Sequence, residues 1–158
     1  MLEQFNISQD QKETLIHAVS WITILIAGAD GSIENEELEW AKKITQIRAY
    51  KYPKVLENFY VEVGKTFQAN IDALISELPG DVSKRTSILS EKLATLNPIL
   101  AILDNESAYS LYNSYTSFAE HIAKSDGGFL GFFSVSPEEK KLIGLPMLDQ
   151  IVPAEDSE

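Results

Sequence analysis

Carboxylates are concentrated in one short turn of this sequence, within residues 27–38. Asp30 ends an apolar helical pattern, and Glu34, Glu36 and Glu37 begin the next one. Acids this close together repel one another unless they are solvated, protonated or share a cation. Calcium and magnesium take hard oxygen ligands of this kind. The turn is therefore a candidate site for a divalent cation.

The same turn appears a second time, 96 positions later in the chain. Residues 26–31 match residues 122–127, so that Asp126 corresponds to Asp30. The second copy contains an insertion at 128–135 before its own acidic helix start. Two such units indicate an internal duplication and predict one site built from both halves. The candidate metal ligands are Asp30, Glu34, Glu37, Asp126, Glu138 and Glu139.

An EF-hand is the obvious alternative, because Asp30 and Glu37 have the spacing of the second half of its loop. Counted back, loop positions one and three fall on Ile26 and Gly28, which carry no side-chain oxygen. A standard EF-hand is therefore excluded, and a cation here needs ligands from elsewhere in the chain, for which the second copy is the natural source. The other interpretation is that these acids only cap helices and solvate the surface.

These features resemble the TerB-like family, which is named for tellurite resistance. The resemblance covers about residues 8–148 and implies a compact bundle of about seven helices with two pseudo-symmetric halves. It also implies a divalent-cation site and a binding or scaffolding role in a bacterial stress response. The insertion before Glu138 and Glu139 departs from the family pattern. The residues that carry the resemblance are Ala29-Asp30-Gly31, Ile33, Glu36-Glu37-Leu38, Ser125-Asp126-Gly127 and Pro137-Glu138-Glu139.

The length and composition of the chain limit the classes of protein to which it can belong. The 158 residues are 44% hydrophobic and carry 24 acidic and 13 basic side chains, a formal net charge of −11. This length predicts one domain over 1–158, with a core at 8–148 and an acidic tail at 153–158. So few basic residues exclude a nucleic-acid partner. Because the sequence has no cysteine, we expect no disulfide and no thiolate metal site, and we expect a cytoplasmic protein.

Apolar residues recur at spacings of three and four along most of the chain, which is the pattern of amphipathic helices. The sequence therefore predicts an all-α domain without strands. The first helix is apolar on several sides and should be central, but its apolar run at 15–29 is too short to span a bilayer. We expect helices over 8–28, 35–48, 54–78 (divided or bent at Gly64), 82–96, 105–124 and 137–143, with a short apolar segment at 99–103.

Local signals mark the ends of these helices. Ser8 and Gln11 have the spacing of a capping box. Asp81 is a candidate N-cap, and Asp104 or Asn105 is another. Gly31 can adopt the positive φ that ends a helix at little steric cost.

Other residues offer alternatives to cation binding. An exposed Phe129–Phe133 loop would be a docking patch for a protein partner, whereas the same loop folded back would add to the core. His121 either joins the metal site or interacts with the end of its helix. Paired carboxylates or a metal-bound water could hydrolyse a substrate, although the sequence has no nucleophile motif. A metal-free interaction module and, less favoured, a metal-dependent hydrolase are therefore the alternatives.

Overall fold

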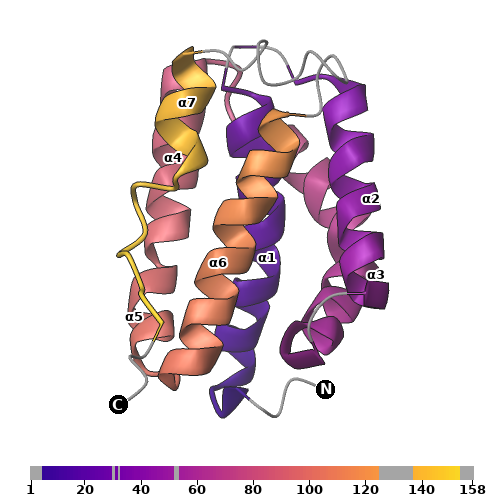
Figure 1. The fold of residues 1–158 in the computed structure, drawn as a ribbon. Helices are drawn as coiled ribbons and strands as arrows, with labels where there is room; N and C mark the ends of the chain where they lie inside the picture. The colour runs from indigo at the N-terminus through magenta and orange to yellow at the C-terminus, as the bar shows by residue number, and fades with distance from the viewer. Residues whose placement is uncertain (1–4, 30, 32, 52–53, 125–136, 154–158) are drawn as a thin grey trace.

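The computed structural model describes residues 5–29, 31, 33–51, 54–124 and 137–153, and all regular structure in these ranges is helical (Figure 1). The predicted all-α class is confirmed, and this part of the chain contains no strand. The helices are α1 (Gln9–Ala27), α2 (Asn35–Lys51), α3 (Lys54–Glu77), α4 (Val82–Ala94), α5 (Leu96–Ala101), α6 (Asn105–Ala123) and α7 (Pro137–Ile143).

Helix α1 is the centre of the bundle and contacts each of the other six helices. Its last two turns are buried on every side, because all residues from Ile22 to Ala27 are at most 1% exposed. This confirms the predicted central position of the first helix. Although α1 is rich in apolar residues, neither it nor any other helix in the described ranges is long and apolar enough to cross a membrane.

Several helix ends meet at one end of the bundle. Figure 1 shows that α1 and α6 run in one direction, whereas α2, α4 and α7 run in the other. The last turns of α1 and α6 and the first turns of α2, α4 and α7 therefore lie together, and we call this the turn end. The two acidic segments of the sequence adjoin these helix ends.

The helix starts follow the predicted capping signals. The Ser8 hydroxyl accepts a hydrogen bond from the Gln11 backbone N–H at 3.1 Å, and the Gln11 side chain accepts one from the Ser8 N–H at 2.9 Å. The carboxylate of Asp81 accepts the Lys84 N–H at 2.9 Å, and that of Asp104 accepts the Ser107 N–H. Each cap satisfies a donor that the first helical turn leaves without a helical partner.

Two boundaries differ from the prediction in an informative way. α3 is continuous through Gly64, an exposed residue that neither divides the helix nor ends it. The fifth helix begins at Leu96, earlier than the predicted segment at 99–103, because Thr95 keeps a nearly helical backbone. Pro98 falls in the first turn of α5, where a missing N–H costs no helical hydrogen bond.

Helices α1 and α6 are built alike. Both are 19 residues long, and both end in a C-cap with nearly the same backbone geometry, φ −95° and ψ 4° at Gly28 and φ −94° and ψ 1° at Lys124. The two helices also pack against each other. The Tyr115 hydroxyl of α6 donates a hydrogen bond of 2.8 Å to the Leu15 carbonyl of α1. Burial raises the pKa of the Tyr115 hydroxyl well above its usual value, and the nearby Tyr60 raises it further.

A buried arginine joins α2 and α3 to α6. Arg48 is 4% exposed, and its guanidinium donates hydrogen bonds of 2.9 Å to the Tyr60 hydroxyl, the Ser114 carbonyl and the Ser117 hydroxyl. The same guanidinium lies over the rings of Tyr60 and Phe118. A charge buried this deeply is tolerated only when its donors are satisfied. Arg48 therefore holds three helices together at a fixed spacing.

Candidate functional site

The described residues of the turn between α1 and α2 form backbone hydrogen bonds with α1 and with one another. Gly28 caps α1 and donates its N–H to the Ile24 carbonyl at 2.9 Å, and the Gly31 N–H is bonded to the Gly28 carbonyl at 3.0 Å. Gly31 has a φ of 102°, which confirms the predicted left-handed conformation. Ile33 follows, half-buried and packed against the core. The chain thus reverses direction at this turn with its apolar residue directed inward.

Two of the predicted ligands, Glu34 and Glu37, lie at the start of α2. The Glu34 carbonyl accepts the N–H groups of Glu37 at 3.1 Å and Leu38 at 3.2 Å, so the helix begins directly after Glu34. Glu34 is exposed, whereas Glu37 is 3% exposed. Both have interactions with other groups. A carboxylate as buried as that of Glu37 has a structural or binding role beyond solvating the surface.

The remaining predicted ligands fall outside what the structure describes. Asp30 and Asp126 lie outside the described residues, as does the Phe129–Phe133 loop. Glu138 and Glu139 belong to α7, but their side chains are likewise outside the description. Among the described residues, no three His, Asp or Glu side chains are close enough together to hold a metal ion. Glu34 and Glu37 alone are therefore an incomplete ligand set, and the other four candidates stay predictions.

A hydrogen bond connects α2 to α6 at the turn end. The indole N–H of Trp40 on α2 donates to the His121 carbonyl of α6 at 3.0 Å. Trp40 lies one helical turn after Glu36 and Glu37, and His121 lies in the last turn of α6. The start of α2 and the end of α6 are thereby neighbours in space, although 81 positions separate the bonded residues.

The His121 imidazole is exposed and belongs to this end of α6. Partial burial lowers its pKa below the usual value, and the positive charge of Arg48 lowers the pKa further. The adjacent Glu120 opposes this effect, whereas Lys124 reinforces it. The imidazole is therefore predominantly neutral at neutral pH, the form in which a histidine can accept a hydrogen bond or bind a metal.

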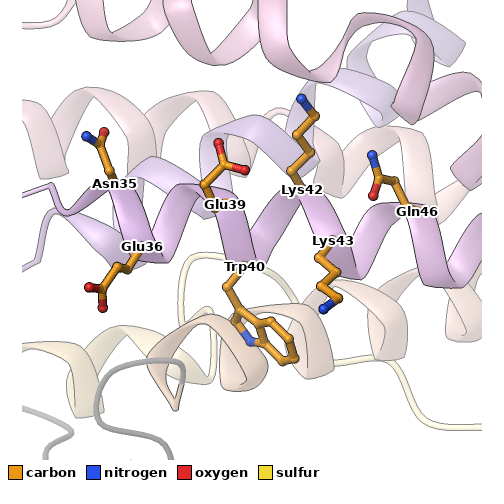
Figure 2. A pocket seen from close by; sticks show the side chains of 7 residues that line it. All are labelled: Asn35, Glu36, Glu39, Trp40, Lys42, Lys43 and Gln46. Carbon is orange, nitrogen blue, oxygen red and sulfur yellow. The ribbon is translucent and has the colours of Figure 1, made fainter.

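A hollow of about 670 Å³ runs along α2. Figure 2 shows that Glu36, Trp40 and Lys43 project to one side of the helix, whereas Asn35, Glu39, Lys42 and Gln46 project to the other. The lining therefore carries two carboxylates and two ammonium groups. Because these charges balance, the hollow does not select a ligand by charge.

Sequence reasoning missed the arginine that contacts the turn. Arg85 on α4 is 7% exposed, and its Nη2 donates a hydrogen bond of 2.8 Å to the Gly28 carbonyl. A signal was present, because Arg85, Leu89 and Leu93 are spaced by four and form one buried face of α4. An arginine in such a register is directed inward and must find an acceptor. Arg48 shows the same signal, four positions after the buried Ile44.

Comparison with known proteins adds no family assignment. The sequence matches no family model, and neither the curated proteins nor the solved structures contain a match to the chain.

Proposed function

We propose that this chain is a non-enzymatic, TerB-like binding or scaffolding module with a divalent-cation site shared by its two acidic turns. The residues that would hold the cation, calcium or magnesium, are Asp30, Glu34, Glu37, Asp126, Glu138 and Glu139. The cation would supply charge neutralisation and a bridge between the two turns. The family resemblance implies that the module acts in a bacterial stress response.

The observation that carries the proposal is the 3.0 Å hydrogen bond from Trp40 to the His121 carbonyl. A site shared by both turns requires the first turn of α2 and the last turn of α6 to lie side by side. This bond supports that requirement with an interaction between the two helices themselves. Figure 1 agrees, because α1, α2, α6 and α7 all have an end at the turn end.

The likeness of α1 and α6 supports a duplicated origin for the two turns. Their N-caps, Ser8 and Asp104, are separated by the same 96 positions as Asp30 and Asp126. The buried positions of the two helices also correspond at this separation. The pairs are Leu15 with Leu111, Val19 with Tyr115, Ile22 with Phe118, Ile26 with Ile122, and Ala27 with Ala123.

The described donors suit a hard cation. Glu34 directly precedes α2, and Glu37 follows three positions later in its first turn, a spacing that places helical neighbours on one side. Glu37 is buried and Glu34 is exposed, which would let an ion keep water on the Glu34 side. Magnesium and calcium both bind proteins with part of their hydration shell in place.

The test is a calorimetric titration of the metal-stripped protein with calcium and with magnesium. Asp30→Asn, Glu37→Gln and Asp126→Asn are compared with Glu13→Gln, a matched control because Glu13 is an exposed acid in the first turns of α1. We expect binding in the wild type and in the control. Loss of binding in both aspartate variants would support one site across the two halves.

Other outcomes would change the proposal. Loss in the Asp30 and Glu37 variants alone would confine the site to the first half. No binding at about millimolar cation would contradict the proposal, because even weak extracellular calcium modules bind in that range. The interaction module would then be tested with Phe132→Ser, which should abolish partner capture and leave folding intact. Turnover of a phosphate ester or glycoside that Asp30→Asn abolishes would overturn the non-enzymatic assignment.

A further inference from the structure

The segment that follows α7, residues 145–153, lies against the bundle without forming a helix or a strand. Figure 1 shows that it runs from the end of α7 toward α5. Its two leucines are buried, Leu145 at 0% and Leu148 at 6% exposed, and both belong to the core. The segment is therefore held by particular side-chain contacts and not by regular secondary structure.

One asparagine of α5 binds the backbone on both sides of Leu148. The Asn97 Nδ2 donates a hydrogen bond of 3.1 Å to the Met147 carbonyl, and the Asn97 Oδ1 accepts one of 2.8 Å from the Asp149 N–H. An asparagine amide carries a donor and an acceptor, so one side chain can bind a carbonyl and an N–H together. Nearly every residue has these backbone groups, so Asn97 can bind another segment in the same way.

A second asparagine extends the contact to α6. The Asn105 Nδ2 donates a hydrogen bond of 3.1 Å to the Val152 carbonyl. The two asparagines thus bind the backbone, whereas Leu148 supplies a buried side chain. Proteins that bind peptides divide the work in this way, because backbone hydrogen bonds give affinity and side-chain pockets give specificity.

The segment leaves part of the groove empty. A hollow of about 260 Å³ remains, lined by Asp149 and Ile151 of the segment and by residues of α5 and α6. Ile102, at the end of α5, is 63% exposed, and Val152 is 60% exposed. A segment with larger apolar side chains would fill more of this space and cover more of this surface.

Charge favours a ligand that is less acidic than this segment. The chain has a net charge of −11, which attracts a basic segment and repels an acidic one. The segment itself contributes the exposed acid Asp149. Pro153 and Glu106 of α6 line a second, smaller hollow. A basic side chain at the position of Pro153 would therefore lie near the Glu106 carboxylate.

We propose that this groove, formed by Asn97, Asn105 and the pocket of Leu148, binds a segment of another protein in competition with residues 145–153. The partner segment carries a leucine at the position of Leu148 and a basic residue at that of Pro153. The inference is independent of the proposed cation site, because it uses none of the candidate ligands. A tethered segment competes at an effective concentration of about millimolar, so a better-fitting segment is needed to displace it.

The experiment measures the binding of a labelled peptide, residues 145–153 with Pro153→Lys, by fluorescence anisotropy. It uses the intact 158-residue chain as wild type and as Leu148→Ser, which loosens the chain's own segment and leaves the groove unchanged. Leu148→Ser combined with Asn97→Leu removes the backbone contact. Gln150→Ser is the matched control, because Gln150 is an exposed residue of the same segment. Circular dichroism establishes that each protein is folded.

We expect Leu148→Ser to bind the peptide about tenfold more tightly than the wild type or Gln150→Ser, because its groove is free more of the time. Binding should be lost when Asn97→Leu is added. No binding by folded Leu148→Ser, or binding that persists with Asn97→Leu, would overturn the proposal. Dimerisation of the wild type that the peptide reverses would also overturn it, by assigning the groove to the segment of a second copy.

Hydrogen exchange of the wild type tests the competition without any substitution. The Asp149 N–H, which is bonded to Asn97, should exchange at least about tenfold faster than the N–H groups in the middle of α1. Displacement requires the segment to open while the bundle stays folded. Equal protection of Asp149 and α1 would show that the segment is released only by global unfolding, and would overturn the proposal.

Discussion

Helices α1 and α6 share their length and C-cap geometry, yet each receives an arginine in a different way. Arg48 reaches the middle of α6, where the Ser114 carbonyl and the Ser117 hydroxyl accept its hydrogen bonds, and it also donates one to the Tyr60 hydroxyl of α3. Arg85 reaches the carbonyl of Gly28, the C-cap of α1, through one hydrogen bond. Of these two similar helices, α6 is therefore bonded to an arginine in the core, Arg48, whereas α1 is bonded at the turn end to Arg85.

This difference predicts that the two arginines contribute unequally to the stability of the bundle. Arg48 has several partners from three helices, so its removal should disturb packing at the centre of the fold. Arg85 has its hydrogen bond at a turn, so its removal should act mostly on that turn. Substitutions of the two arginines and of the residues that they contact distinguish these two roles.

The largest effect is expected from Arg48→Met. The substitution fills similar volume but leaves the Ser114 carbonyl and the Ser117 and Tyr60 hydroxyls without their charged donor, so the free energy of unfolding should fall by about 3 kcal/mol. Arg85→Met should cost about half as much, because one hydrogen bond is lost. Urea unfolding measures both, with exposed Lys43→Met as the control. A larger loss for Arg85→Met than for Arg48→Met would contradict the larger contribution of Arg48 to stability.

The next effect is expected from Gly28→Ala. Its Cβ would meet the Arg85 guanidinium at 2.7 Å and the Ile24 carbonyl at 2.9 Å, and overpacking of this kind should cost about 2 kcal/mol. Gly31→Ala is the matched variant: only backbone strain at φ 102° opposes it, and it should cost about 1 kcal/mol. The double variant Gly28→Ala with Arg85→Met should lose less stability than the sum of its parts. Strict additivity would show that Arg85 does not constrain Gly28.

Tyr115→Phe should have a smaller effect. It removes the 2.8 Å hydrogen bond to the Leu15 carbonyl that joins α6 to α1, at a cost of about 1 kcal/mol. Thermal unfolding measures the loss, and Tyr109→Phe serves as the control because Tyr109 is only half-buried. Equal losses in the two variants would mean that this bond does not hold the paired helices together.

The smallest effect concerns pH. Because the folded-state pKa of His121 lies below its usual value of 6.5, the unfolded chain binds more protons between the two values. The contribution of His121 to stability is therefore present above pH 6.5 and is lost as the pH falls through the folded-state pKa. An NMR titration should find the lowered pKa in the wild type, and a higher pKa in Arg48→Met, which removes a nearby positive charge. An unchanged pKa in that variant would rule out the electrostatic effect of Arg48.

The sequence predicted local features well because their causes are local. The capping box at Ser8, the N-caps at Asp81 and Asp104 and the positive φ of Gly31 each depend on a few adjacent residues. The helix ends were predicted within a few residues for the same reason. Two boundaries shifted: α2 ends at Lys51 rather than at 48, and α5 begins at Leu96 rather than at 99. The second shift arises because tolerance of proline depends on its position within the turn.

The candidate site was harder to predict because its neighbours come from distant parts of the chain. The position of Arg85 on the buried face of α4 could be inferred from spacing, but its acceptor, 57 positions earlier, could not. The burial of Glu37, which is 3% exposed, likewise has no signal in the neighbouring sequence. The predicted all-α class is confirmed, whereas the shared cation site stays a prediction.

The hydrogen bond of Trp40 also gives the molecule an optical probe. The chain has two tryptophans, and the other, Trp21, lies on α1 beneath the ammonium group of Lys92. Replacing Trp21 with phenylalanine would leave Trp40 as the sole indole fluorophore, bonded to the last turn of α6. Its emission would then report on the spacing of α2 and α6 without any attached dye. A change in that emission on addition of a cation would register rearrangement of the turn end in real time.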